Sequence, residues 1–390
     1  MQTFDAIVLG MGAMGAAAAY QLAKRGVRVL GIDQYDPPHQ QGSTHGETRI
    51  TRIACGEGEN YAPFARRSHE IWREAERELG IGPGALLTQN GMILIAGPKE
   101  QRGHGISAFL NRTFSIAANV GVPAERLSAS DVRSRFPAFA VADDECAYLD
   151  QVSGFVRPEA CVMAQLWLAR RYGATTHTNE KVLQFEPSGG GVRVTTDKGE
   201  YRAGRLIVTA GSWLPELVPD AAHHFKVRRQ VLYWFAAKDE AQHACFAPTR
   251  FPVFIWLIPA MQPIYGFPAL GNLQDGIKIA TEQELTTTDP KSVDWNVSTT
   301  ERGEMYETYV RPFFPGLSGN CVRAEVCLYT NVDKGRFIID RHPSMDKVIV
   351  ASPCSGHGFK HSAAIGETLA QMVTGEQHLD ISPFAFNPVA

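Results

Sequence analysis

The chain has 390 residues, of which 44% are hydrophobic and 20% are charged, as is typical of a globular protein long enough for two or three domains. Its formal net charge is −3 and it has no long run of Lys or Arg, so we predict neither nucleic acid nor a membrane surface as a partner. No apolar run approaches the ~20 residues that a membrane-spanning helix needs.

The seven cysteines stand at scattered positions without a Cys-x-x-Cys pair, so we predict no metal site and no redox dithiol. The first predicted strand begins within about five residues of the N-terminus, which leaves no room ahead of it for a secretory signal. We therefore expect a cytoplasmic protein whose partners are small molecules.

The first predicted unit is a buried strand over residues 6–9, a glycine-rich turn and an alanine-rich helix over residues 13–25. Gly10 permits a tight turn, Gly12 lets a pyrophosphate approach the backbone, and Gly15 lets the helix pack closely on the strand. The next strand ends in Asp33, roughly twenty residues beyond the glycines, where a carboxylate binds the ribose of an adenosine. This unit predicts a dinucleotide site, and an acid at this position argues against a 2′-phosphate.

The elements expected up to residue 213 alternate between helices and short strands after a polar, turn-rich stretch over residues 35–49. They are a helix over 61–79, a strand over 91–96, a helix over 105–120, a helix over 159–172, strands over 174–177 and 181–186, a hairpin over 192–203 and a strand from 205. The last strand runs into glycine again, which predicts a return to the nucleotide sheet.

Longer strands rich in aromatic residues follow between residues 227 and 281, and the chain ends with strands over 337–340 and 348–351 and a helix over 361–373. Tyr233, Phe254 and Trp256 suggest room for a large substrate side chain, although the sequence leaves open which face of the sheet they occupy. We predict an α/β fold, with a Rossmann-like nucleotide-binding domain (1–88, 146–220 and 322–390) and a substrate-binding domain (89–145 and 221–321) on a mixed or antiparallel sheet with helices.

Five motifs in order carry a resemblance to one family. They are the glycine loop with Asp33, residues 37–52 (Pro-Pro-His-Gln-Gln-Gly-Ser-Thr-His-Gly-Glu-Thr-Arg-Ile-Thr-Arg), 265–268 (Tyr-Gly-Phe-Pro), 327–330 (Cys-Leu-Tyr-Thr) and 355–360 (Ser-Gly-His-Gly-Phe-Lys). Over its whole length the chain resembles the monomeric sarcosine oxidase and N-methyltryptophan oxidase group of FAD-dependent amine oxidases. The resemblance implies that the bound dinucleotide is FAD.

The resemblance also implies a covalent bond between Cys327 and the flavin 8α-methyl group. A thioether prevents loss of the flavin and tends to raise its redox potential. The alternative to a flavin bond is that Cys327 is simply a small buried apolar residue, as we expect for the other six cysteines. The remaining positions matched to FAD contacts are Gly10, Gly12, Gly15, Asp33, Ser43, Thr44, Val182, Gly211, Tyr329, Gly356, His357, Gly358 and Lys360.

For the substrate, the resemblance implies that Arg52 and Lys360 together hold a carboxylate. The guanidinium of Arg52 offers a planar fork of donors to this anion, and the ammonium of Lys360 offers a point charge. Tyr265 would border the substrate and Tyr329 would form a second wall. At Glu282 the sequence departs from the family, which typically has a pocket histidine there. The substrates of the family therefore cannot simply be transferred to this chain.

Three further positions are matched, like Tyr265, to catalytic ones. Arg49 and His45 would lie beside the flavin ring, although His45 could equally be a hydrogen-bonded loop residue. Lys278 would stand near flavin N5 and stabilise superoxide forming from O₂. A lysine between two isoleucines is equally compatible with the solvent side of an alternating strand.

The resulting functional prediction is FAD-dependent oxidation of a secondary amino acid, N-methyl or cyclic, to an imine, with O₂ reduced to H₂O₂, by a protein that we expect to be a monomer. The imine then hydrolyses, giving formaldehyde from N-methyl substrates, and no strong general base is expected. Sarcosine, N-methyltryptophan, pipecolate and a glycated amino acid all remain open as substrates. The alternatives are a flavin amine dehydrogenase with another electron acceptor and a non-catalytic flavin-binding subunit.

Overall fold

The structure is a computed structural model that describes residues 1–97, 106–283 and 286–388. Within these residues the strands form two sheets of eight strands and one of three. The first sheet has the order β10-β11-β12-β1-β2-β9, and β19 pairs with β12 and with β18. Its strands are β1 (Gln2–Leu9), β2 (Val29–Ile32), β9 (Thr175–His177), β10 (Val182–Ser188), β11 (Gly191–Thr196), β12 (Glu200–Val208), β18 (Ile338–His342) and β19 (Met345–Ser352).

The centre of the first sheet is parallel, because β1 pairs in parallel with β2 and β12, β2 with β9, and β12 with β19. Its strands are buried on both faces, which explains why β1 reads as a continuous apolar run. Ala6 and Val8 point into one core cluster, whereas Ile7 and Leu9 point into another. Strand, glycine turn, helix and second strand thus occur in the predicted order.

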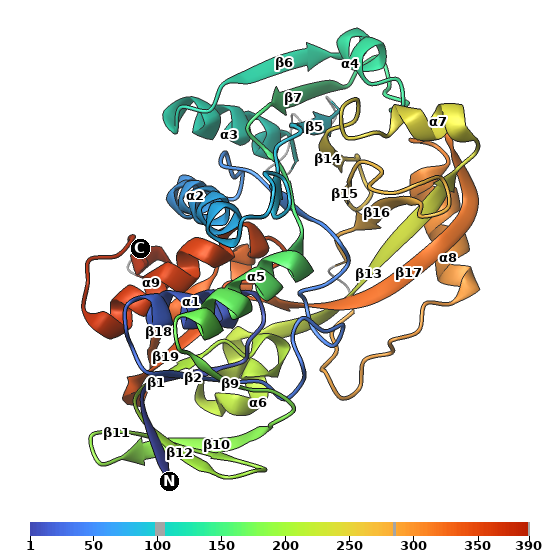
Figure 1. Cartoon of the computed structure of the whole chain (residues 1–390). Coiled ribbons are helices and arrows are strands. Elements are labelled where there is room, and N and C mark those ends of the chain that lie inside the picture. The colour runs from blue at the N-terminus through green and yellow to red at the C-terminus, as the bar shows by residue number, and fades with distance from the viewer. Residues whose placement is uncertain (98–105, 284–285, 389–390) are drawn as a thin grey trace.

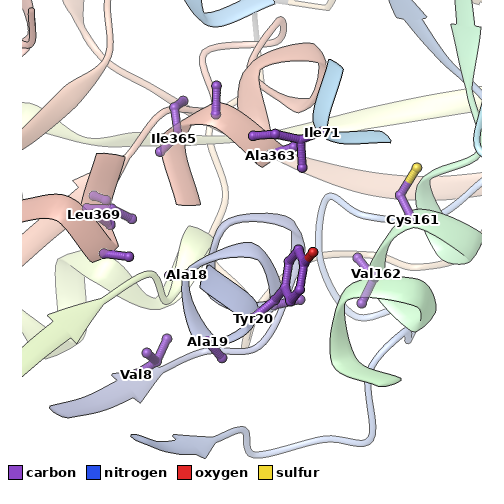
Figure 2. Packing of buried hydrophobic residues seen from close by; sticks show 14 of the residues in the cluster. Val8, Ala18, Ala19, Tyr20, Ile71, Cys161, Val162, Ala363, Ile365 and Leu369 are labelled. Carbon is purple, nitrogen blue, oxygen red and sulfur yellow. The ribbon is translucent and has the colours of Figure 1, made fainter. Parts of the chain in front are cut away.

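Helices α1 (Ala13–Lys24), α5 (Pro158–Arg171) and α9 (Ser362–Thr374) lie together over one face of this sheet (Figure 1). Figure 2 shows the close-up, with α1 between α5 and α9 and with Ile71 of α2 (Ala62–Leu79) beside Ala363. The small side chains of α1 permit this packing: a Cβ added at Gly366 of α9 would lie 2.3 Å from the Cβ of Ala17. The apolar contacts of this layer fix the start of α1, where the dinucleotide turn lies.

The second sheet has the order β17-β13-β16-β15-β14-β5-β7-β6. It is mixed, because β14 and β5 pair in parallel and its other strand pairs are antiparallel. Its strands are β5 (Met92–Ala96), β6 (Ala124–Ser128), β7 (Cys146–Asp150), β13 (Lys226–Ala237), β14 (Val253–Leu257), β15 (Ile264–Gly266), β16 (Ile277–Thr281) and β17 (Leu317–Asn331). The predicted fold class is confirmed.

The remaining elements surround the two large sheets. Strands β3 (Arg49–Thr51), β8 (Gly154–Val156) and β4 (Leu87–Thr88) form the small sheet, and the further α-helices are α3 (Ile106–Asn119), α4 (Ala129–Arg135), α6 (Leu214–Leu217), α7 (Glu240–Cys245) and α8 (Thr299–Met305). Helix α3 matches the helix expected over 105–120, although residue 105 lies outside the described residues. No described helix has the length and hydropathy to cross a membrane.

The division into two domains stays a prediction. The sheets show, however, that strands assigned to the predicted nucleotide-binding domain pair within the second sheet. Strand β7 and the strand that carries Cys327, β17, both belong to the second sheet. The long antiparallel pair β13 and β17 brings Cys327 opposite Gln230. A residue that the sequence placed with the nucleotide-binding segments therefore lies on the substrate-side sheet.

Candidate functional site

The dinucleotide turn has the geometry that its glycines predict. Gly10 has a φ of 85°, and a Cβ at Gly15 would lie 1.7 Å from the carbonyl oxygen of Gly10. The backbone at Gly12 is open, because a Cβ there would meet only the Oγ1 of Thr44, at 3.7 Å. At the end of β2 the carboxylate of Asp33 accepts hydrogen bonds from the amides of Met11, at 2.7 Å, and Tyr35, at 2.9 Å.

A cavity of about 270 Å³ begins at this turn and continues between the loop after β2 and the loop before α9. It also reaches Gly211, where an added Cβ would meet no atom within 4 Å. An open glycine backbone, a helix N-terminus and a carboxylate at the end of the second strand fit the pyrophosphate and ribose of FAD. The predicted FAD contacts that line this cavity are Gly10, Gly12, Asp33, Ser43, Thr44, Val182, Gly211, Tyr329, Gly356 and Gly358.

Gly15 contributes to this cavity without lining it, and its replacement is a direct test of the turn. We expect Gly15→Ala to reduce the free energy of unfolding by about 1–3 kcal/mol, the usual range for overpacking, and to weaken FAD binding, because the Cβ would overlap the Gly10 carbonyl. Urea denaturation and flavin titration measure both effects.

Gly303→Ala is the matched control, because Gly303 lies in α8 and a Cβ there meets no atom within 4 Å. This control should be neutral or slightly stabilising. Equal stability and flavin affinity of Gly15→Ala and wild type would contradict the role of the close approach.

A second cavity, of about 740 Å³, shares a wall with the first at Arg49, Tyr329, Gly356 and Phe359. Among the predicted site residues it contains Arg52, Tyr265, His357 and Lys360. The shared wall thus separates the proposed cofactor from the proposed substrate residues. This arrangement suits a reaction in which a small molecule meets one end of a bound flavin.

Arg52 and Lys360 line the second cavity together with Glu57, and we call the part of the cavity at these buried cations its inner end. Both cations are buried, and the Nη2 of Arg52 lies 2.5 Å from Oε1 of Glu57. Although burial raises the pKa of Glu57, Arg52 and Lys360 outweigh it and hold that pKa well below its usual range. Burial lowers the pKa of Lys360, and Glu57 partly restores it. Two buried cations thus share one buried carboxylate, that of Glu57, at this end of the cavity.

Tyr265 and Tyr329 form one wall of this cavity, and their hydroxyl oxygens lie 3.2 Å apart. Arg49 is held between the two cavities, because its guanidinium donates to the carbonyl oxygens of Thr48 and Ser43, each at 2.8 Å. His357 lies near Lys360, and burial together with that cation lowers its pKa to about 4. His357 is therefore neutral at pH 7.

Lys278 is buried, with only 3% of its surface exposed, and it lines neither of the two cavities. Its ammonium donates to the carbonyl oxygens of Gly46, at 2.6 Å, and Thr48, at 2.9 Å, and lies 4.7 Å from the ring centroid of Phe267. The alternative that Lys278 is on the solvent side of its strand is wrong. Burial, and then the positive charge of Arg49, lowers the pKa of Lys278 well below its ordinary value.

His45 and Cys327 are also buried and line neither cavity. The Nδ1 of His45 lies 3.1 Å from Oε2 of Glu325, which also binds Arg323. Cys327 packs with Leu232, Trp234, Ala280 and Tyr329 in a small cluster. Burial raises the pKa of the Cys327 thiol to about 11, against the opposing charges of Arg49 and Lys278. The roles of His45 and Cys327 stay predictions.

The expectation that Tyr233, Phe254 and Trp256 provide room for a substrate is wrong. All three are at most 2% exposed and belong to the apolar core on the other face of the second sheet. Because side chains alternate along a strand, the residue between the last two, Ile255, points into the second cavity instead. The cavity wall at β14 is thus aliphatic.

Sequence reasoning missed Glu57 and Arg228, which both line the second cavity. Glu57 follows Arg52 by five residues in a loop, and the short spacing of an acid from a predicted carboxylate-binding arginine was the available signal. Arg228 had no signal, because neighbouring Arg229 on the same strand looks identical in sequence and lies on the opposite face.

The residues that surround the first cavity fit a bound dinucleotide, and the comparison with protein families identifies that dinucleotide as FAD. Residues 5–372 match the family model described as FAD dependent oxidoreductase, and the chain belongs to this family. The FAD cofactor and the prediction that the chain is an enzyme are thereby confirmed, and two relatives at 32–36% identity confirm the predicted family.

Two curated proteins are similar to this chain over nearly its whole length. Monomeric sarcosine oxidase from Streptomyces avermitilis is 36% identical over 371 residues, which are 95% of this chain and 93% of that protein. N-methyl-L-tryptophan oxidase from Salmonella heidelberg is 32% identical over 388 residues, 98% of each chain. A solved structure of NikD, described as an unusual amino acid oxidase, covers 99% of this chain with a TM-score of 0.84 and 23% identity, which supports the fold alone.

Proposed function

We propose that the chain oxidises secondary amino acids, N-methyl or cyclic, to imines, with O₂ as the electron acceptor. The observation that supports this proposal most directly is the burial of Arg52 and Lys360 at the inner end of a cavity that borders the FAD cavity. Two converging cations bind one carboxylate strongly and fix the orientation of an amino acid. The names of the relatives, both oxidases of N-methyl amino acids, support the same class of substrate.

Glu57 gives this site a resting partner for Arg52. A guanidinium has five N–H donors, and in the structure Arg52 uses Nη1 toward Ala54 and Nη2 toward Glu57. The incoming carboxylate would bind the remaining donors together with the ammonium of Lys360. The lowered pKa of His357, about 4, makes its imidazole a weak base, and the two tyrosines are protonated. The site therefore offers no strong base near pH 7, so the substrate amine would bind deprotonated.

FAD held in the first cavity would supply the acceptor for the hydride equivalent that the substrate loses from the carbon beside the amine nitrogen, and O₂ would take up the two electrons as H₂O₂. Lys278 supports the oxidase over a dehydrogenase. Its ammonium is buried and held by the carbonyl oxygens of Gly46 and Thr48, and a fixed positive charge stabilises negative charge that develops on a nearby oxygen. The hydrolysis of the imine, and formaldehyde from N-methyl substrates, follow in water.

Anaerobic mixing with a panel of N-methyl and cyclic amino acids tests this function. We expect at least one of them to bleach the flavin absorbance, and admission of air to restore it with formation of H₂O₂. Absence of bleaching across the panel would favour a non-catalytic flavin-binding subunit. Bleaching followed by slow recovery in air, with fast recovery on adding a quinone, would favour a dehydrogenase.

Arg52→Met sharpens the test, because it removes the carboxylate contact and leaves an apolar chain of similar length. We expect the substrate concentration for half-maximal bleaching to rise by roughly 10- to 100-fold, the value of a charge-assisted hydrogen bond. The decarboxylated amine of the same substrate should react equally poorly with variant and wild type. A variant that binds the amino acid as well as wild type would remove Arg52 from its role.

The finer predictions belong to the same proposal. Covalent attachment through Cys327 follows from its motif, and the monomeric state follows from the resemblance.

A further inference from the structure

One face of the two-stranded β13–β17 ribbon carries both Cys327, the predicted flavin attachment point, and residues that line the second cavity. In the antiparallel register Cys327 stands opposite Gln230, Tyr329 opposite Arg228, and Asn331 opposite Lys226. Opposed residues share a face, and each step of two residues moves about 7 Å along the strand. Arg228 therefore lies one step beyond the predicted flavin attachment point, beside the cavity wall formed by Tyr329.

Arg228 lines the second cavity and is partly buried there. Its Nε is buried and has no hydrogen-bond partner among the described residues. The next residue on the strand, Arg229, faces the other way and is satisfied, with hydrogen bonds to Glu301, Asp294 and Asn296. A buried donor without a partner is costly, so the cavity at Arg228 is suited to a ligand that supplies an acceptor.

The side chains that line the second cavity carry an excess of positive charge. Seven Lys and Arg side chains and three Asp and Glu side chains are among the described residues that line it. One of the three acids, Glu57, is paired with Arg52, and another, Asp333, lies 3.1 Å from the ammonium of Lys226. A neutral, zwitterionic amino acid needs only the inner cations, so the excess positive charge favours a substrate with an additional negative charge.

The third acid, Glu282, lies nearer to the inner end. A Cβ at Gly356 would be 2.7 Å from its Oε1, and its charge acts on Lys360. A negative charge at this place disfavours a second anion beside the substrate amine. It leaves the region of Arg228 as the favourable place for that anion.

We propose that Arg228 is a specificity residue that binds a second anionic group of the substrate, so that the preferred substrates are N-substituted amino acids with an acidic side chain. This inference rests on the proposed amino acid oxidase function and specifies its substrate class. Arg228 contributes to binding, away from the reacting carbon, so its effect belongs in KM rather than in kcat.

The test compares N-methyl-L-glutamate with its neutral isostere N-methyl-L-glutamine on the flavin-loaded enzyme. We expect wild type to prefer the acid in kcat/KM by roughly 10- to 100-fold, the value of a hydrogen bond to a charged group. Arg228→Gln should abolish the preference by raising KM for the acid only. Arg228→Lys should retain part of it, because the charge remains and the fork is lost.

Arg311→Gln is the matched control, since it removes the same charge from an exposed residue that is paired with Glu307 outside the cavity. Equal kcat/KM for both substrates in wild type would overturn the inference, as would an equal loss for both in Arg228→Gln. If neither substrate and no other N-methyl amino acid reduces the flavin, the proposed function fails instead. Flavin content and thermal unfolding show that each variant is folded.

Discussion

Lys278→Met is expected to slow the reaction of the reduced enzyme with O₂ by roughly 100- to 1000-fold, the usual effect of removing one preorganised charge or donor. Reduction by substrate should change little. The structure provides the physical reason: the ammonium is held at fixed distances from two carbonyl oxygens and is buried away from water. Charge that develops on oxygen at such a place meets a positive partner without reorganisation. Stopped-flow measurement of the two half-reactions separates the effects.

The pH dependence gives a second readout with a defined sign. Burial lowers the pKa of Lys278 well below its ordinary value, so its positive charge is present at low pH and is lost as the pH rises through that lowered value. The rate of reaction with O₂ should therefore fall on going to alkaline pH, earlier than an exposed lysine would titrate. The same profile should be flat in Lys278→Met.

Lys291→Met is the control for this prediction, because Lys291 is an exposed lysine paired with Glu216. Its oxygen kinetics should match those of wild type. If Lys278→Met reacts with O₂ as fast as wild type, the acceptor site lies elsewhere, and the dehydrogenase alternative gains support.

The contrast between Lys278 and Gly15 shows what sequence could predict. The glycine turn is local: strand, turn and helix adjoin in the chain, and each glycine has its own steric reason. The position of Lys278 depends on the register that places it opposite Trp234. A lysine in an alternating strand fits either face equally well, and only pairing with β13 and contact with the loop of residues 46–48 bury it.

The same limit explains the error at β14. Alternation correctly predicts that Phe254 and Trp256 share a face and that Ile255 occupies the other. It does not tell which face meets the cavity, because both faces of this sheet are covered and both are apolar. The sequence suggests large aromatic side chains as cavity walls, whereas in the structure they fill the apolar core on the other face of the sheet. Arg228 was missed for the same reason.

Cys327→Ser is expected to release all FAD when the protein is denatured in acid, whereas wild type keeps the yellow colour and the mass of FAD on the polypeptide. The variant should still bind FAD reversibly, because the first cavity, with the open glycine backbone and Asp33, is unchanged. It should also turn over more slowly, because the thioether raises the redox potential that drives oxidation of the amine. Mass measurement of the denatured chain, with and without prior FAD, detects the bond.

The structure supplies a demanding control for that result, because a second thiol lies close by. Cys354 lines the first cavity, which Cys327 does not, and its sulfur accepts the amide of Thr330 at 3.4 Å. If Cys327 is the attachment point, Cys354→Ser keeps the covalent flavin. Attachment to apoprotein should also become faster as pH rises, because the thiolate is the nucleophile and the pKa of Cys327 is raised to about 11. Loss of the bond in Cys354→Ser, with retention in Cys327→Ser, would transfer the role to Cys354 and contradict the motif.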